Sequence, residues 1–460
     1  MKQLQAGTSR GEITPPVGIA HTNWGAQTHQ RAETIDMPLY CTAIVFSDGE
    51  LELAIIDLDI IWIMPELDQS IRQAITAQTG IQPQNIRLSY SHTHSGPIVD
   101  ITWATEGDDL IPTYVASLPE ISARAVHEAQ KTLQPVHIGA GRGVCDMNIN
   151  RRAMADDGSV FVGRNWDGYV DQEVLVVSID SLAGSPVATI VNYACHGTTM
   201  GPANRAITPD FPGPMRQTVE RNIGGLCLFL QGATGNVHPL YSYSANPAIY
   251  RRNGLRLGLE AARVRASIDP VPREEYLLDI RPSGASFGTY EDRPVGNPDG
   301  TLGVVNKNLS FPVRDYPLVS SAQIDFDEKK SILREARASG DEALIRAAAW
   351  PARHAELALL HARLFGGGTV TVNVQGIRLG PTVLVGVPLE PFTETGTAIK
   401  KESPAPYTLF SGYTNGYYGY IPTEDAFPLG GYEVDTSPYN ADATDSLIAT
   451  CLEVIDLLWP

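Results

Sequence analysis

The chain has few cysteines and no long uninterrupted hydrophobic run. Its five cysteines are scattered over 460 residues without a Cys-x-x-Cys pair, which excludes a disulfide framework as its organising principle. The most apolar stretch, residues 53–64, contains Asp57 and Asp59 and is too short to span a bilayer. The amino terminus lacks the apolar core of a secretory signal. These absences predict a cytoplasmic protein without stable membrane insertion.

Positive charge is also scarce. The chain has 34 Lys and Arg against 52 Asp and Glu, a formal net charge of -18, which argues against nucleic acid and anionic membranes as partners. A hydrophobic content of 43% with 42 glycines and 33 prolines is typical of a soluble, loop-rich globular enzyme. The expected partner is therefore a small molecule, and a homo-oligomer is left open.

Strand and helix patterns follow one another along the chain. Residues 39–46 and 53–63 read as strands, residues 65–79 as a helix, and a further strand begins at Ile86. Strand, helix and strand in this order predict a right-handed crossover between parallel strands. The fold class predicted is mixed α/β (α+β), with mixed β-sheets flanked by helices. Further strands are expected at 136–139, 173–179, 187–195, 226–230, 370–377, 382–387 and 407–411, and further helices at 114–133, 211–220, 250–268 and 444–458.

No internal repeat, low-complexity segment or clear linker divides the chain. Residues 1–460 are therefore expected to form a single composite domain. Residues 146–152 are polar and predict a loop, and residues 280–320 are rich in Gly, Pro, Asn and Asp and predict an irregular excursion. Residues 325–365 are Ala-rich and predict a mostly helical insertion.

Two histidines close the strand that begins at Ile86. His92 and His94 are spaced by one residue, and side chains at i and i+2 leave the same face of a strand. Gly96 and Pro97 then end the strand. Two adjacent imidazoles suit a divalent metal, or one ligand beside a proton shuttle. The alternative is a polar strand end with hydrogen-bonded histidines.

Other candidate residues also follow predicted strands, and each has a structural alternative. His196 ends the strand over 187–195, where sites in α/β proteins commonly form, but it could be a core histidine. Glu390 follows the strand over 382–387 and could cap the next helix. Arg151 could be a structural ion-pair partner, with Arg152 competing for its role. Tyr420 and Tyr432 lie in a segment dense in Tyr and Gly, where packing is the alternative.

As an ordered set, these motifs resemble the neutral (alkaline, non-lysosomal) ceramidase family. Members are zinc amidohydrolases that cleave the N-acyl bond of ceramide. The resemblance implies that Zn2+ is held by His92, His196, Glu390 and Tyr420, and that His94, Arg151 and Tyr432 are the catalytic groups. The matching motifs are GEITPP at 11–16, SHTHSGP at 91–97, NINR at 148–151, NYACH at 192–196, PLE at 388–390, GYIPT at 419–423 and GYE at 431–433.

The implied chemistry is attack by metal-activated water. Zinc lowers the pKa of bound water from roughly 15.7 to about 7, His94 would take its proton and pass it to the leaving amine, and Arg151 and Tyr432 would donate to the developing oxyanion. An ester or lactone hydrolase with the same centre is one alternative. A non-catalytic, metal-containing binding protein is the other.

The chain departs from the family pattern in two places. The family motif Gly-Asp-Val-Ser-Pro corresponds to Gly235-Asn-Val-His-Pro239 here, so a serine nucleophile is not expected. Larger ceramidases carry a C-terminal β-sandwich domain that is not expected in this chain, and the substrate predicted is a smaller, soluble amide or a lipid-like one.

Three further patterns lie outside the motif set. Residues 284–288 match G-x-S-x-G, but no helix is predicted after them, so a nucleophile elbow is not expected. Asp57 and Asp59 on their strand, and Asp210, are expected to orient groups around the site.

Overall fold

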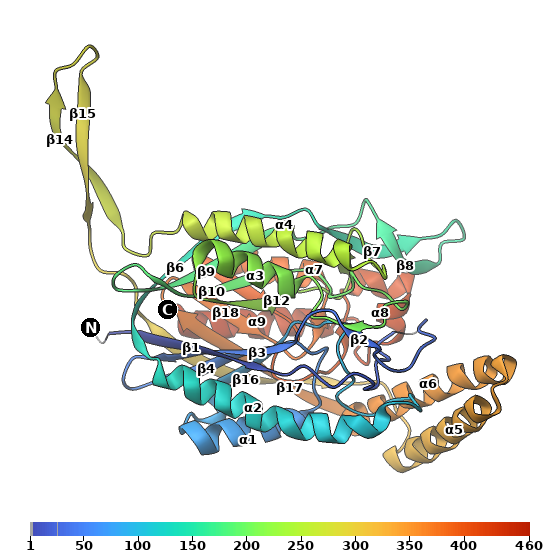
Figure 1. The fold of residues 1–460 in the computed structure, drawn as a ribbon. Coiled ribbons are helices and arrows are strands. Elements are labelled where there is room, and N and C mark those ends of the chain that lie inside the picture. Colours follow the sequence, from blue (N-terminus) through green and yellow to red (C-terminus); the bar gives the residue numbers. More distant parts are fainter. Residues whose placement is uncertain (1–2, 25) are drawn as a thin grey trace.

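Strands with continuous runs of buried residues build a large mixed sheet at the centre of the protein (Figure 1). The computed structural model describes residues 3–24 and 26–460. Within that part of the chain, the sheet has the strand order β12-β10-β9-β6-β1-β3-β4-β5. The strands are β1 (Gln5–Glu12), β3 (Tyr40–Ser47), β4 (Glu52–Leu58), β5 (Ile86–Tyr90), β6 (Gln134–Val144), β9 (Glu173–Ser181), β10 (Pro186–Tyr193) and β12 (Leu226–Gln231).

The predicted crossover is confirmed. Strands β4 and β5 pair in parallel and are connected through helix α1 (Pro65–Thr79). Gly80 ends the helix in the left-handed region, with φ 79°, and its N–H donates to the carbonyl of Thr76, as glycine commonly does at a helix C-terminus. The strand expected over 53–63 is shorter than predicted, because β4 ends at Leu58.

The large sheet is made of two halves that bend toward each other. Strands β1 and β6 join the halves through only two residue pairs, Gln5 with Pro135 and Ala6 with Gln134. The outer strands β5 and β12 therefore come into contact, and the N–H of Phe229 donates to the Asp57 carboxylate at 3.0 Å. Helices α1 and α2 (Ile111–Lys131) cover one half, and α3 (Pro212–Ile223) and α4 (Pro247–Ala266) cover the other (Figure 1).

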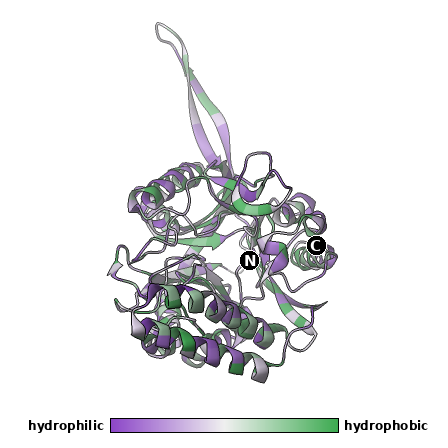
Figure 2. Ribbon diagram, turned by 90° about the vertical axis from the view of Figure 1, so that its right-hand side faces the viewer, coloured by the Kyte–Doolittle hydropathy of each residue, from purple (hydrophilic) through white to green (hydrophobic). Residues whose placement is uncertain are grey.

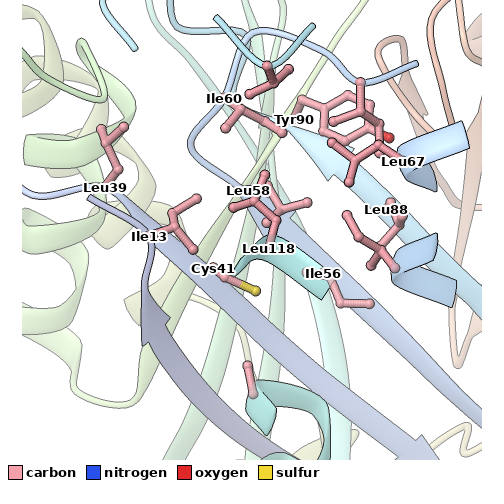
Figure 3. Packing of buried hydrophobic residues seen from close by; sticks show 14 of the residues in the cluster. Ile13, Leu39, Cys41, Ile56, Leu58, Ile60, Leu67, Leu88, Tyr90 and Leu118 are labelled. Carbon is pink, nitrogen blue, oxygen red and sulfur yellow. The ribbon is translucent and has the colours of Figure 1, made fainter. Parts of the chain in front are cut away.

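Apolar side chains hold α1 and α2 against the first half of the sheet. Leu58 of β4 and Leu88 of β5 share one buried cluster with Leu67 of α1 and Leu118 of α2 (Figure 3). Burial of each such side chain contributes about 1.5–3 kcal/mol. This packing sets the position of the loops that leave β4 and β5.

A second sheet packs against the inner face of the first. Its strands are ordered β16-β17-β18-β20, and Ile377, Leu384 and Leu409 share a buried cluster with residues of the large sheet such as Ile55 and Leu228. The predicted hairpin between β17 and β18 is confirmed, and α9 packs on this sheet. These elements are β16 (Leu302–Pro312), β17 (Thr369–Leu379), β18 (Thr382–Gly386), β20 (Tyr407–Ser411), α7 (Thr393–Glu402) and α9 (Ala443–Leu458).

Two predicted loops are strands. Most of the polar stretch 146–152 lies in β7 (Asn148–Met154), which pairs with β8 (Val160–Asn165) and β13 (Val237–Pro239). The excursion expected over 280–320 contains strand β16 and much of a hairpin formed by β14 (Arg273–Arg281) and β15 (Phe287–Pro294). Pairing with distant or adjacent strands supplies order that the local composition does not indicate. Two short strands, β2 (Thr34–Ile35) and β11 (Ala206–Ile207), also pair.

The hairpin of β14 and β15 projects away from the rest of the protein (Figure 1). Figure 2 shows both hydrophobic and hydrophilic segments along it, and Leu277, Ile280 and Tyr290 are exposed. The G-x-S-x-G match at 284–288 spans its turn and the start of β15, so the prediction that it is not a nucleophile elbow is confirmed.

The segment expected to be helical forms a pair of helices, α5 (Val319–Ser339) and α6 (Glu342–Phe365). Asp341 caps α6 by accepting from the backbone N–H groups of Ala343 and Leu344. The pair extends from the side of the protein opposite the projecting hairpin (Figure 1). None of the helices in the described residues combines the length and apolar character required to cross a bilayer.

Asp57 and Asp59 hold helix α3 rather than a site histidine. Arg216 of α3 donates to Asp57 at 2.8 Å and to Asp59 at 2.5 Å, and all three side chains are buried. The expectation that these aspartates orient site groups is therefore wrong, because their acceptor oxygens face a buried guanidinium.

Replacing Arg216 is expected to destabilise the protein strongly. Arg216→Met leaves two buried carboxylates unpaired, so the free energy of unfolding should fall by about 3–5 kcal/mol, measured by urea denaturation. Arg221→Met on the same helix, at an exposed position, is the matched control and should change stability little. Equal stability of the two variants would contradict the assigned role of the buried ion cluster.

Candidate metal centre

His92 lies in a loop beyond the strand, not on it. Strand β5 ends at Tyr90, and His92 has a φ of 56° in the left-handed region, so strand alternation does not explain how His92 and His94 meet. The turn is held by the N–H of His92, which donates to the carbonyl of Ile60 at 3.1 Å. The two Nε2 atoms nevertheless lie 3.2 Å apart, so the predicted convergence holds while its predicted cause is wrong.

The loop after β10 brings His196 to the same place. Thr93 and Gly197 form an isolated parallel bridge, and the N–H of His94 donates to the carbonyl of Gly197 at 3.1 Å. A Cβ atom at position 197 would lie 2.4 Å from the carbonyl oxygen of His92, so this close approach requires glycine. As a result, the Nε2 atoms of His92 and His196 are 2.9 Å apart.

Backbone carbonyls orient both histidines. His92 Nδ1 lies 2.8 Å from the carbonyl oxygen of Ile61, and His196 Nδ1 lies 3.1 Å from that of Thr234. A carbonyl can only accept, so each Nδ1 carries the hydrogen and each Nε2 presents a lone pair. Asp210 does not orient a histidine, as had been expected, because its carboxylate accepts from the N–H groups of Met200 and Phe211.

The facing lone pairs fit a divalent cation. Burial lowers the pKa of His92 and of His196 well below the usual range, so a shared proton does not relieve the repulsion between them. The Glu390 Oε2 atom lies 3.9 Å from His92 Nε2 and 3.8 Å from His196 Nε2. Two imidazoles and a carboxylate are a donor set that metals such as zinc accept in catalytic sites. With His94, the three histidines form a group whose candidate ligand atoms lie within 4.8 Å of one another.

Glu390 is held by tyrosines. Strand β19 (Glu390–Pro391) pairs with β21 (Tyr420–Ile421), which sets Glu390 opposite Tyr420. Tyr413 donates to its Oε2 at 3.0 Å and Tyr417 to its Oε1 at 2.7 Å. Glu390 does not cap helix α7, which has no side-chain cap. Sequence reasoning missed Tyr413 and Tyr417, for which the Tyr-rich composition of 412–440 was the only signal.

Arg151 has the ion-pair role that the sequence left open, and its catalytic role stays a prediction. From β7, its Nε donates to Glu433 at 2.7 Å and its NH2 donates to the Tyr420 hydroxyl at 3.1 Å. Arg152 donates to the other oxygen of Glu433 at 2.8 Å. Glu433, on the short helix α8 (Tyr432–Asp435), was also missed by sequence reasoning. Arg151 is thus ion-paired and also borders the site.

The centre lies at a cavity of about 740 Å³. His92, His94, Arg151, Glu390, Tyr420 and Tyr432 contribute to its lining, whereas His196 is fully buried behind them. Tyr432 is 52% exposed, and its ring centroid lies 5.7 Å from that of Tyr420. The apolar part of the lining includes Trp24, Trp62, Ile98, Ile101, Leu357 and Leu360. The structure therefore brings all seven predicted site residues together around one cavity.

His94 differs from the other two histidines in its surroundings. Its Nδ1 atom has no hydrogen-bond partner in the described part of the chain, and its ring centroid lies 5.0 Å from that of Trp24. Burial lowers the pKa of His94 to about 3, with Arg151 acting in the same direction. The structure therefore keeps this imidazole neutral near pH 7.

His238 stands where the family motif has serine. It lies in β13, is 1% exposed, and its ring centroid is 5.2 Å from that of Tyr243. Its two ring nitrogens find no hydrogen-bond partner among the residues that the structure describes. The position presents no hydroxyl group for nucleophilic attack.

The fold and the centre together define a mixed α/β protein with buried imidazole and carboxylate donors at one end of a largely apolar cavity. Residues 4–229 match the family model described as "Neutral/alkaline non-lysosomal ceramidase, N-terminal". Over these residues the chain resembles members of this family.

Individual proteins of this family are similar to the chain. The chain is 23% identical over 503 aligned residues to the neutral ceramidase of Mycobacterium tuberculosis, covering 99% of this chain and 77% of that protein. It is 27% identical over 254 residues to neutral ceramidase A of Dictyostelium discoideum, covering 51% of this chain and 36% of that protein. The matched region thus spans about a third of the Dictyostelium protein.

Solved structures show the same fold. The neutral ceramidase from Pseudomonas aeruginosa superposes with a TM-score of 0.70 at 17% identity, covering 99% of this chain and 74% of that one. The fold class predicted from the sequence is confirmed.

Proposed function

We propose that the protein is a zinc-dependent hydrolase that cleaves an amide (N-acyl) bond with metal-activated water. The observation that carries this is the position of three donor atoms. The Nε2 atoms of His92 and His196 are 2.9 Å apart, and the Glu390 Oε2 atom lies within 3.9 Å of both. The relatives named neutral ceramidases support the choice of an amide. His92, His196, Glu390 and Tyr420 would hold the zinc.

When bound, zinc supplies a nucleophilic water at neutral pH. His94 takes a proton at Nε2 and passes it to the leaving amine, because it lines the cavity, is neutral and has its Nε2 3.2 Å from that of His92. Arg151 and Tyr432 donate to the oxygen of the scissile carbonyl. Glu433 keeps the Arg151 guanidinium in place, and Tyr413 and Tyr417 keep the Glu390 carboxylate in place.

The substrate is a small N-acyl amide with one lipid-like chain. A volume of about 740 Å³ lies within the range of ordinary small-molecule sites, and the tryptophan and aliphatic lining suits an acyl chain. We further propose that residues 1–460 act as one composite catalytic unit, because the loops after β5 and β10 and the strands β19 and β21 all contribute to the centre.

Removal of the metal is the direct test. The protein is expected to carry one zinc per chain by mass spectrometry, and a zinc chelator should lower turnover of an N-acyl amide by about 100-fold or more. Addition of Zn2+ should restore it. Full turnover by protein shown to be metal-free would contradict the proposal. Assays with esters and lactones test the alternative that the centre cleaves these bonds instead. Bound zinc without turnover of any of these substrates would indicate a binding protein.

A further inference from the structure

Helix α6 places charged side chains in the wall of the cavity. Arg353 and Glu356, three residues apart on this helix, both line it, together with the apolar Leu357 and Leu360. Residues three positions apart on a helix lie on the same face, so the two side chains are neighbours. Arg353 and Glu356 therefore form a polar strip beside the apolar lining of the cavity. None of the sequence motifs of the centre contains these two residues.

Arg353 has no acceptor of its own. In the part of the chain that the structure describes, it makes no hydrogen bond or ion pair, and its Nε is shielded from solvent without a partner. The guanidinium lies over the Trp103 ring at 5.0 Å from the centroid. By contrast, Arg151 in the same cavity is paired with Glu433. A partly buried guanidinium without acceptors is unfavourable unless a ligand supplies them.

Glu356 does not neutralise Arg353 near neutral pH. Its Oε1 accepts from the backbone N–H of Trp103 at 2.8 Å, and burial raises the pKa of this carboxyl to about 8. At pH 7 the group is therefore mostly protonated and can donate a hydrogen bond. The strip presents one positive charge and one neutral donor to the cavity.

Arg353 shares the cavity with the proposed centre. Arg353 and Tyr432 both line it, and the ring centroids of Tyr432 and Tyr420 are 5.7 Å apart. A group bound by Arg353 therefore lies in the same cavity as the residue proposed to contact the scissile carbonyl.

We propose that the cavity selects N-acyl amides that carry a carboxylate close to the scissile bond, as an N-acyl amino acid does, and that Arg353 binds this carboxylate. A guanidinium binds a carboxylate through two parallel charge-assisted hydrogen bonds, and Glu356 can add a third donor. The inference rests on the proposed amide hydrolysis and names its substrate class.

The test compares three amides of equal chain length. N-lauroylglycine carries the carboxylate on the amine side, the succinyl monoamide of dodecylamine carries it on the acyl side, and lauroyl ethanolamide is neutral. One of the two carboxylates should be preferred over the neutral amide, and its identity shows which side faces Arg353. Arg353→Gln should lower kcat/KM for that substrate by about 10- to 100-fold, mainly through KM, and change the neutral amide less than about twofold.

Matched variants separate this role from a structural one. Arg346 is on the same helix, and its side chain is 74% exposed. Arg346→Gln should leave kcat/KM unchanged for both the carboxylate substrate and the neutral amide. Glu356→Gln keeps a neutral donor and should retain the carboxylate preference. An unchanged ratio of carboxylate to neutral substrate in Arg353→Gln would overturn the proposal.

Binding distinguishes failure of this inference from failure of the proposed function. Calorimetry measures the affinity of N-lauroylglycine and of the succinyl monoamide in the His94→Ala background, with and without Arg353→Gln. Affinity that depends on Arg353 without turnover of any amide by the wild type would retain the carboxylate site and refute the hydrolase. Amide turnover by the wild type, with an affinity that does not depend on Arg353, would retain the hydrolase and refute the carboxylate site.

Discussion

His196→Ala is expected to remove the metal and lower amide turnover by roughly three orders of magnitude, as expected when a metal that contributes several kcal/mol to the transition state is lost. His196 is fully buried, its Nδ1 is held by the carbonyl of Thr234, and its Nε2 faces that of His92 at 2.9 Å. Gly197 brings the loop that carries His196 against the backbone of His92. The metal content by mass spectrometry and the steady-state rate are the two readouts.

A matched control for this variant is His137→Ala, on β6 and outside the lining of the cavity. It should keep both metal and rate. Circular dichroism shows whether His196→Ala remains folded. A folded His196→Ala protein with a full complement of zinc would remove His196 from the centre and, with it, the proposed mechanism.

His94→Ala is expected to keep the metal and lose about 10²- to 10⁴-fold in rate, the usual contribution of a general acid–base group. The structure separates His94 from the proposed ligands: the Nδ1 atoms of His92 and His196 lie 2.8 and 3.1 Å from backbone carbonyls, whereas the Nδ1 of His94 makes no such hydrogen bond in the described chain, although the Asn23 backbone raises its pKa. Metal ligands almost always have such a partner.

The leaving group supplies a second readout for His94→Ala. The rate loss should be largest for alkyl amides, whose amines must be protonated to leave, and smallest for an activated nitroanilide, which needs little protonation. Loss of zinc from this variant would instead make His94 a third histidine ligand, in line with the close grouping of the three imidazoles. Equal rate losses for all leaving groups would exclude it as the acid.

The sequence predicted the elements whose periodicity is local. Helix α1 and its terminal Gly80 follow from the spacing of residues 65–80, and the β17–β18 hairpin follows from two adjacent apolar runs. The order of the motifs also predicted which residue types meet at the site: His92, His94, Glu390, Tyr420 and Tyr432 line one cavity, and His196 is buried behind them. Their roles as ligands and catalysts remain predictions.

Other parts of the protein depend on contacts between distant segments. Strand β7 was expected to be a loop because its polar residues carry no strand pattern, and it is ordered by pairing with β8 and β13. Asp57 and Asp59 were expected near the site but face Arg216, because the two halves of the large sheet bend together. No local pattern indicates such a seam.

The sequence by itself therefore determined the elements with a local periodic pattern, the fold class and the set of side chains available for chemistry, since these depend on neighbours along the chain. Only the tertiary structure decided how the set is used: the left-handed turn at His92, the contact of Gly197 with its backbone, and the tyrosines that hold Glu390. It also decided that helix α6 adds Arg353 to the cavity. The physical reason is that hydrogen bonds and close contacts between segments far apart in the chain depend on three-dimensional distance, which residue order alone does not specify.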